Sequence, residues 1–289
     1  MKIIRINGGL GNQMFQYAFG LKLQYLHPDE NVLFDLKDFR GYNRSYELEY
    51  VFGLKLPQPS FFQLCRLTFP FSENAFPGNH LYRFRKKYKT EVYDEQEFRY
   101  CEEILNLPGD HYYMGYWANE GYFSDIRDKI LDAFTFRRPL CQKSNEYLEQ
   151  IKHSNSVSIH VRRGDYLRIK LFQGICELDY YEKAINYIKN NVENPHFFIF
   201  SNDIQWCKEN ILDCTDGHYT TVELNDPLNN YVDMQLMSCC KHNIIAHSTF
   251  SWWAAWLNRH PEKIVVAPYR WVNRSTPYKP QLKDWILID

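Results

Sequence analysis

The feature that most constrains the fold is a regular alternation of short apolar runs and amphipathic stretches that begins at Ser154. The apolar runs have the length and composition of buried strands, and they cover residues 157–161, 196–200, 219–224, 243–246 and 263–267. The stretches between them predict helices at residues 179–190, 204–210, 231–240 and 252–259. Strands that alternate with helices are typical of a parallel, doubly wound α/β sheet.

The beginning of the chain shows the same order on its own. Residues 2–7 predict a strand, Gly8 to Gly11 break it, and residues 12–26 carry apolar side chains at helical spacing before a second strand at 31–36. We therefore expect two α/β domains, 1–150 and 151–289, with the boundary between residues 137 and 155. The proline-interrupted stretch 53–109 is predicted to be helical with irregular connections.

The composition of the chain limits its possible partners and its cellular location. The formal net charge of -1 lacks the basic excess that sequence-independent nucleic-acid binding needs, so we expect no nucleic-acid partner. No apolar run has the length of a signal peptide or a membrane span, and the eight cysteines form no C-x-x-C pair. These features predict a cytoplasmic protein with reduced thiols.

The strongest candidate site follows the first strand of the second half, where the chain reads HVRRGDY. Because side chains alternate along a strand, His160 and Arg162 share one face, and that face meets the sheet edge where α/β proteins bind ligands. A guanidinium matches two phosphate oxygens in a way that an ammonium cannot, so Arg162 is predicted to bind a diphosphate. Arg163 points the other way and is predicted to form a structural ion pair.

Two further strand ends are polar. One reads Ser201-Asn202-Asp203, and the other runs from His247 through Ser248 into a helix. Small hydroxyl residues at a helix start leave backbone N–H groups available to an anion. Asp233, in DMQLMSCC, could accept hydrogen bonds from a guanine edge or a ribose hydroxyl.

Four separated segments, GGLGNQMFQYA, HVRRGDY, the SND turn and STFSWWAAWL, together resemble the α-1,2-fucosyltransferases of glycosyltransferase family 11. The resemblance spans nearly the whole chain. It implies a GT-B-like fold, with two Rossmann-like domains facing a cleft. It also implies inverting, metal-independent transfer of fucose from GDP-β-L-fucose, with a 2-hydroxyl of a terminal galactoside as the expected acceptor. Animal members carry an N-terminal membrane anchor that is not seen here, which favours a bacterial enzyme.

The resemblance also implies residue roles. It assigns the C-terminal domain to the donor and the N-terminal domain to a glycan or lipid-linked oligosaccharide acceptor. Arg162 would contact the β-phosphate, and His160 and Asp233 would lie near the nucleoside. Asn202 and Asp203 are further donor-side residues. The diphosphate would be bound by Ser248, Thr249, Phe250 and Ser251. A loop near the transferred sugar would contain Gly9, Gly11, Asn12 and Gln13.

Neutralisation of the leaving group and the catalytic base are separate questions. No D-x-D pair is present to hold a cation, so arginine and helix-end N–H groups are expected to stabilise the departing diphosphate without a metal. Asp35, Glu177 and Asp165 are open candidates for the base, and Asn12 is a further candidate catalytic residue.

Two alternative functions remain open from the sequence alone. GGLGN followed by Asp35 could indicate a dinucleotide-binding oxidoreductase, although Met14 stands where G-x-G-x-x-G has its third glycine. A non-catalytic sugar-nucleotide or glycan-binding protein is also open.

Trp252, Trp253 and the aromatics of 112–117 are predicted to be core residues. Five cations could contact an anionic membrane surface, namely Arg83, Arg85, Lys86, Lys87 and Lys89.

Overall fold

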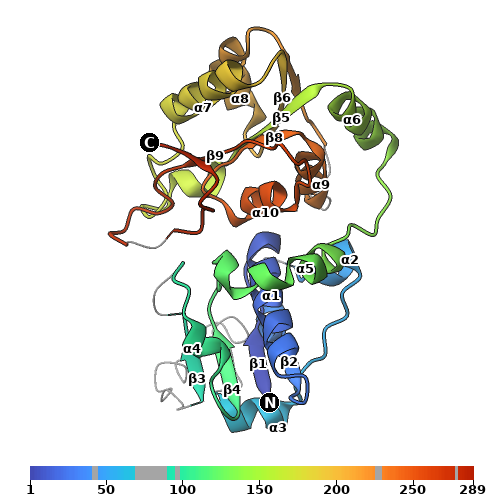
Figure 1. Ribbon diagram of the computed structural model, residues 1–289, viewed down its shortest axis with the longest axis vertical. Coiled ribbons are helices and arrows are strands. Elements are labelled where there is room, and N and C mark those ends of the chain that lie inside the picture. Colours follow the sequence, from blue (N-terminus) through green and yellow to red (C-terminus); the bar gives the residue numbers. More distant parts are fainter. Residues whose placement is uncertain (41–44, 69–89, 95–97, 225–229, 277–278) are drawn as a thin grey trace. The chain divides into compact units, whose positions relative to one another are not determined.

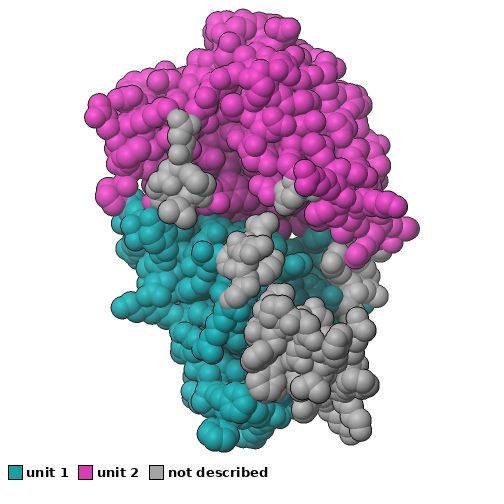
Figure 2. Space-filling model, turned by 180° about the vertical axis from the view of Figure 1, so that it is seen from behind, with its two compact units in different colours: residues 1–138 teal, residues 139–289 magenta. Residues whose placement is uncertain are grey.

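The computed structural model describes residues 1–40, 45–68, 90–94, 98–224, 230–276 and 279–289. The chain divides into two compact units, Met1–Arg138 and Pro139–Asp289 (Figure 2). The division lies within the predicted range 137–155 but before the predicted domain limit at 150/151. Helix α6 (Gln142–Lys152) falls in the second unit because it packs against a strand and a helix of that unit, β5 and α9.

Unit 1 contains a parallel four-stranded sheet with the order β2-β1-β4-β3. Its strands are β1 (Lys2–Arg5), β2 (Val32–Asp35), β3 (Glu91–Tyr93) and β4 (His111–Met114). Its α-helices are α1 (Leu10–Leu26), α2 (Leu48–Phe52), α3 (Phe61–Leu67), α4 (Glu102–Leu105) and α5 (Arg127–Ala133).

Helix α1 lies directly on this sheet, and a glycine permits the close contact. A Cβ atom on Gly20 would come within 2.5 Å of the Phe34 ring on β2. Ile4, Phe15 and Phe19 are fully buried in the same layer. The first strand and helix of the sequence therefore form one packed β-α unit, as the pattern predicts.

Unit 2 contains a parallel six-stranded sheet with the order β10-β9-β8-β5-β6-β7 (Figure 1). Its strands are β5 (Asn155–Val161), β6 (Pro195–Ser201), β7 (Tyr219–Thr221), β8 (His242–Ile244), β9 (Val265–Pro268) and β10 (Ile286–Ile288). Besides α6, its α-helices are α7 (Leu178–Asn191), α8 (Ile204–Asn210), α9 (Tyr231–Cys239) and α10 (Thr249–Leu257). Helices α7 and α8 cover one face, and α9 and α10 cover the other (Figure 1).

The central strand β5 has two chemically different faces. Val157, Ile159 and Val161 are buried in a hydrophobic core with α7 and α8. On the opposite face, Ser158 accepts a 2.7 Å hydrogen bond from the Asn243 side chain, which in turn accepts one of 2.8 Å from Asn258 at the end of α10. This face therefore holds α10 by buried hydrogen bonds.

The prediction is confirmed for the regular part of the pattern, and it is partly wrong for the middle of the chain. Strand β3 lies inside the stretch predicted to be helical, and β4 and β10 were not predicted as strands. Trp252 and Trp253 are fully buried, which confirms their prediction as core residues. Most of the 112–117 aromatics are buried as well, but Tyr116 is exposed. The five cations at 83–89 lie outside the described residues. No helix among the described ranges has the length and apolar character to cross a bilayer.

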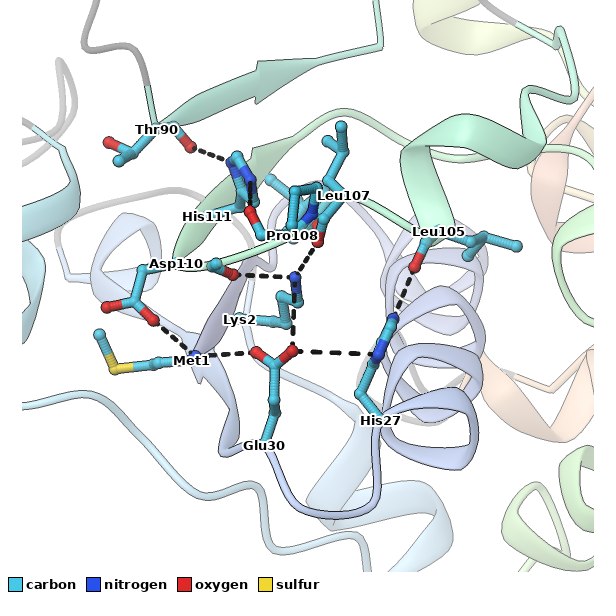
Figure 3. A network of polar contacts seen from close by, with 12 residues as sticks. Met1, Lys2, His27, Glu30, Thr90, Leu105, Leu107, Pro108, Asp110 and His111 are labelled. Carbon is cyan, nitrogen blue, oxygen red and sulfur yellow. Dashed lines mark hydrogen bonds and ion pairs between the residues drawn. The ribbon is translucent and has the colours of Figure 1, made fainter.

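The amino end of β1 is fixed by a network of charged groups (Figure 3). The Met1 amine donates to Glu30 and Asp110 at 2.9 and 2.7 Å. The fully buried Lys2 ammonium donates to the Leu107 and Gly109 carbonyls at 2.5 and 2.9 Å. Lys2 thus holds the loop before β4 against β1.

We expect Lys2→Met to lower the free energy of unfolding by about 2 kcal/mol, since the Leu107 and Gly109 carbonyls lose a charged donor whose side chain is buried. Urea denaturation measures this change. Lys152→Met is the matched control, because Lys152 pairs with Glu149 on an exposed helix face and its loss should shift stability by less than about 0.5 kcal/mol. Equal effects of the two substitutions would contradict the assigned role of Lys2.

Candidate functional site

Polar residues gather where three neighbouring strands of unit 2 end. Strands β8, β5 and β6 are adjacent and parallel, so the residues that follow Ile244, Val161 and Ser201 meet at one edge of the sheet. Ligands of open α/β sheets bind at this carboxyl edge.

His160 lies on the α10 side of β5. Its ring centroid is 5.7 Å from that of Phe250, in the first turn of α10. Burial, and then the nearby Arg162 and His247, lower the pKa of His160 to about 3, so the imidazole is neutral at physiological pH. Its Nδ1 is buried and has no hydrogen-bond partner among the described residues. The structure thus brings His160, Arg162 and Phe250 together.

Arg162 follows β5 directly and is partly exposed. Its guanidinium carbon lies 5.3 Å from the centroid of the Tyr166 ring, within cation–π distance. The cation is therefore held at the sheet edge by an aromatic ring.

Arg163 points to the opposite side, and its predicted structural ion pair is confirmed. Its Nε lies 3.3 Å from the Asp203 carboxylate, and its Nη1 lies 3.9 Å from Glu177. The guanidinium also covers the Trp206 ring at 4.1 Å. The two consecutive arginines therefore have different environments.

Asn202 and Asp203 brace the turn after β5. The Asn202 side-chain oxygen accepts the Arg163 backbone N–H at 3.0 Å. Asp203 accepts the Trp206 N–H at 3.2 Å as the N-cap of α8, in addition to its ion pair with Arg163. Both residues lie at the predicted edge, and these contacts support the neighbouring loop.

The segment 248–251 forms the start of α10. Ser248 is the N-cap, and its hydroxyl accepts the Phe250 N–H at 3.3 Å. The buried Ser251 hydroxyl donates to the Ala246 and Ser248 carbonyls at 3.2 and 3.3 Å. Thr249 is partly exposed in the first helical turn. The positive end of a nine-residue helix thus follows β8 at the same sheet edge.

Asp233 lies in the first turn of α9, which packs against α10. The side chain is half-buried, and no hydrogen bond or ion pair reaches its carboxylate from the described part of the chain. Burial raises the pKa of Asp233 to about 7. An isolated carboxylate of this kind needs hydrogen-bond donors that a ligand can supply.

Four of the predicted donor-side residues lie at the start of α1 in unit 1. Gly9 is the N-cap of α1, and Gly11 and Asn12 lie in its first turn. The Gln13 amide is fully buried, donates to the Gly8 and Ser45 carbonyls at 2.9 and 3.0 Å, and accepts the Glu47 N–H at 2.9 Å. Gln13 therefore ties the glycine turn to the segment at 45–47.

The candidate bases differ in their surroundings. The buried Asp35 carboxylate accepts hydrogen bonds from the Tyr112 hydroxyl at 2.7 Å and the Lys37 N–H at 3.0 Å, and it pairs with the Lys37 ammonium at 2.9 Å. Glu177 is half-exposed and faces Arg163. Asp165 lies in the 3-10 turn Gly164–Leu167, and its side chain lies outside the described part of the structure.

Two residues of the cluster were not predicted as site residues. Tyr166 contacts Arg162, and His247 lies 4.9 Å from the Tyr166 ring. Both stand in motifs that the sequence reveals, directly beside predicted residues. Strand alternation does not predict them, because both lie in loops beyond a strand end.

A family model described as glycosyl transferase family 11 matches residues 78–289 of this chain. An alpha-1,2-colitosyltransferase of Escherichia coli is 34% identical, over 99% of this chain and 98% of its own length. The chain belongs to glycosyltransferase family 11. A second Escherichia coli relative, the O-antigen biosynthesis glycosyltransferase WbnK, is 31% identical over 97% of this chain and 98% of its own length.

The fold of this family 11 chain is also that of solved fucosyltransferases. A crystal structure of the NodZ alpha-1,6-fucosyltransferase, soaked with GDP-fucose, matches 89% of this chain and 91% of that chain with a TM-score of 0.53. The two sequences are 16% identical, so the match shows a shared GT-B fold. Family membership removes the oxidoreductase alternative.

Gly164 allows the tight turn that leads away from Arg163. Its φ is +52°, and a Cβ atom there would come within 2.5 Å of the Asn202 amide nitrogen. We expect Gly164→Ala to lower the free energy of unfolding by roughly 1–3 kcal/mol, from backbone strain and displacement of Asn202. Thermal unfolding measures this effect. Gly217→Ala is the control, because it also has a positive φ of +80° but open space around it. A loss no greater than that of the control would contradict the packing argument.

Proposed function

We propose that this family 11 enzyme transfers fucose, or a closely related deoxyhexose, from its GDP-linked form to the 2-hydroxyl of a terminal galactoside. The acceptor would be part of a bacterial surface glycan or its lipid-linked precursor. The names of the two full-length relatives, an alpha-1,2-colitosyltransferase and an O-antigen glycosyltransferase, support this substrate class.

The observation that carries the proposal is the cluster at the carboxyl edge of the unit 2 sheet. It joins a partly exposed guanidinium, Arg162, with the start of helix α10 and a neutral imidazole, His160. A leaving diphosphate needs positive charge and N–H donors that are already in place. Arginine and a helix N-terminus supply both.

We propose that the reaction needs no divalent metal. The sequence contains no D-x-D pair. Within the described ranges, no three His, Cys, Asp or Glu side chains are grouped in a way that could hold a metal ion. The acceptor 2-hydroxyl oxygen would form a bond to the anomeric carbon and lose its proton, while the bond from that carbon to the β-phosphate oxygen breaks. Arg162 would neutralise the charge that builds up as this pair of electrons moves onto the β-phosphate oxygen.

The base end of the nucleotide is assigned to Asp233. Guanine presents an N1–H and an exocyclic amino group side by side, which can donate to the two oxygens of one carboxylate. Asp233 has such a carboxylate without a donor among the described residues. The imidazole Nδ1 of His160 would accept or donate one further hydrogen bond to the nucleoside.

The transferred sugar has two candidates, fucose and colitose. Colitose lacks the 3-hydroxyl of fucose, and a relative named for colitose transfer covers nearly the whole chain. A site that hydrogen-bonds the 3-hydroxyl would discriminate against colitose, since its polar partner would then remain unpaired.

The decisive experiment is a transfer assay in excess chelator with GDP-fucose and GDP-colitose as alternative donors and a panel of β-galactosides. We expect transfer from one of the two donors, an α-1,2 linkage in the product, and no loss of rate in chelator. GDP binding without transfer to any galactoside would contradict the enzymatic proposal, and full inhibition by chelator would contradict metal independence.

Arg162→Lys in the same assay tests the leaving-group role. The substitution keeps the charge but removes the planar fork, so we expect kcat to fall by about 10²-fold or more. Lys189→Arg, an exchange at a partly exposed ion pair with Asp216, is the control and should leave kcat unchanged. Near-normal turnover of Arg162→Lys would remove this residue from the mechanism.

Asp233 makes donor binding dependent on pH. Its raised pKa of about 7 means that the carboxylate takes up a proton as the pH falls below 7, and guanine would then lose its acceptor. We expect GDP affinity to fall by up to about tenfold per pH unit below 7, and Asp233→Asn to bind GDP weakly with little dependence on pH.

The stability of the fold is expected to depend on pH in the opposite direction from GDP binding. The folded state holds the Asp233 proton more tightly than the unfolded chain, so ionisation destabilises the fold as the pH rises from about 4 to 7. We therefore expect Asp233→Asn to raise the melting temperature at pH 8 but not at pH 4. Unchanged GDP affinity in this variant would exclude Asp233 from the nucleotide site.

A further inference from the structure

We propose that Tyr166 and Asn273 are positioning residues for Arg162. In this proposal the rings of Tyr166, Phe172 and His247 form a platform beside the Arg162 guanidinium. Asn273, which follows β9, acts as a clamp by binding the loop that carries Phe172. The proposal rests on the proposed function, in that the role of the platform is defined by the binding of a diphosphate by Arg162.

Tyr166 is the centre of the platform. Its ring lies 5.3 Å from the Arg162 guanidinium carbon. It also stacks on Phe172, with centroids 4.5 Å apart and an interplanar angle of 22°. His247 completes the group at 4.9 Å. Arg162 therefore meets a ring whose own orientation is fixed by two other rings.

His247 contributes to the platform as a neutral ring. Its Nδ1 lies 3.1 Å from the Cys176 sulfur, and both residues are buried. Burial lowers the pKa of His247 to about 4 and raises the pKa of the Cys176 thiol well above its usual value. A neutral thiol and a neutral imidazole add no positive charge that would repel Arg162.

Asn273 fixes the loop that carries Phe172. Its backbone N–H donates to the Leu171 carbonyl at 2.8 Å, and its side-chain amide donates to the Lys170 and Gln173 carbonyls at 3.1 and 2.7 Å. One residue thus holds three carbonyls of a four-residue stretch. The clamp is itself anchored, because the preceding residues Trp271 and Val272 are buried.

The physical reason for such a platform is the flexibility of arginine. A free arginine side chain loses rotamer entropy when it is fixed on a ligand. A ring that already restricts the guanidinium removes part of that loss, which appears as tighter binding and as better alignment in the transition state.

The first arm of the test compares Tyr166→Leu with Tyr166→Phe, using GDP binding by calorimetry and the transfer rate. We expect Tyr166→Leu to weaken GDP binding about tenfold and to lower kcat, and Tyr166→Phe to restore both, because it keeps the ring. In an Arg162→Ala background, Tyr166→Leu should have no further effect on GDP affinity.

The second arm compares Asn273→Ala with Asn191→Ala. Both substitutions remove an exposed asparagine amide that donates to backbone carbonyls, since Asn191 donates to Tyr187 at 2.8 Å at the end of α7. We expect Asn273→Ala to weaken GDP binding several-fold, again only when Arg162 is present, and Asn191→Ala to bind GDP as the parent enzyme does.

The outcomes separate the two proposals. If the parent enzyme transfers sugar to no galactoside, the proposed function fails. If Arg162→Ala leaves GDP affinity and turnover unchanged, the transfer activity stands, but the role of Arg162 fails and the platform fails with it. If Arg162→Ala has its effect but Tyr166→Leu or Asn273→Ala adds a further full loss in that background, the platform alone is overturned. Wild-type kinetics of both single variants would also overturn it.

Discussion

The two faces of strand β5 determine where everything else in unit 2 can lie. One face is aliphatic and is buried against α7 and α8, while the other carries Ser158 and His160 towards α10. Because the side-chain period of a strand is two residues, a slip of one position would bury the hydroxyl and imidazole in the aliphatic core. The same alternation places Arg162 at the edge beside the start of α10, and it directs Arg163 away.

Much of the polar chemistry at this edge stabilises the protein itself. Asn202, Asp203 and Ser251 lie where the sequence predicts, but each is engaged in bracing a turn, capping a helix or bonding a carbonyl. His160 and Asp233 differ, because each keeps a buried or half-buried polar atom that the described residues leave without a hydrogen bond. This distinction is not readable from residue type. It follows from the contacts, and it separates groups that support a ligand site from groups that can meet a ligand.

The sequence predicts the alternating elements of unit 2 and the β-α start of unit 1, because each is a local period of apolar side chains. It does not predict β3 or β10, which are three residues long and are defined mainly by pairing with strands elsewhere in the chain. The same limit applies to the site. Strand alternation fixes the faces of His160 and Arg162, whereas the contact between the tilted rings of Tyr166 and His247 joins two loops that are far apart in the chain. Such contacts depend on how loops fold back, for which no short-range pattern exists.

The Asn273 clamp has a consequence for how the enzyme can be produced. Asn273-Arg274-Ser275 has the form of an N-glycosylation acceptor, and a glycan would be attached to the same amide nitrogen that donates to Lys170 and Gln173. A eukaryotic secretory host could therefore modify this exposed side chain. The glycan would replace one of the two amide hydrogens, so that a single hydrogen would remain for two carbonyls and a bulky sugar would stand beside the loop. Protein secreted from yeast or animal cells would then differ in activity from the same polypeptide made in bacteria, with no change in its amino acids.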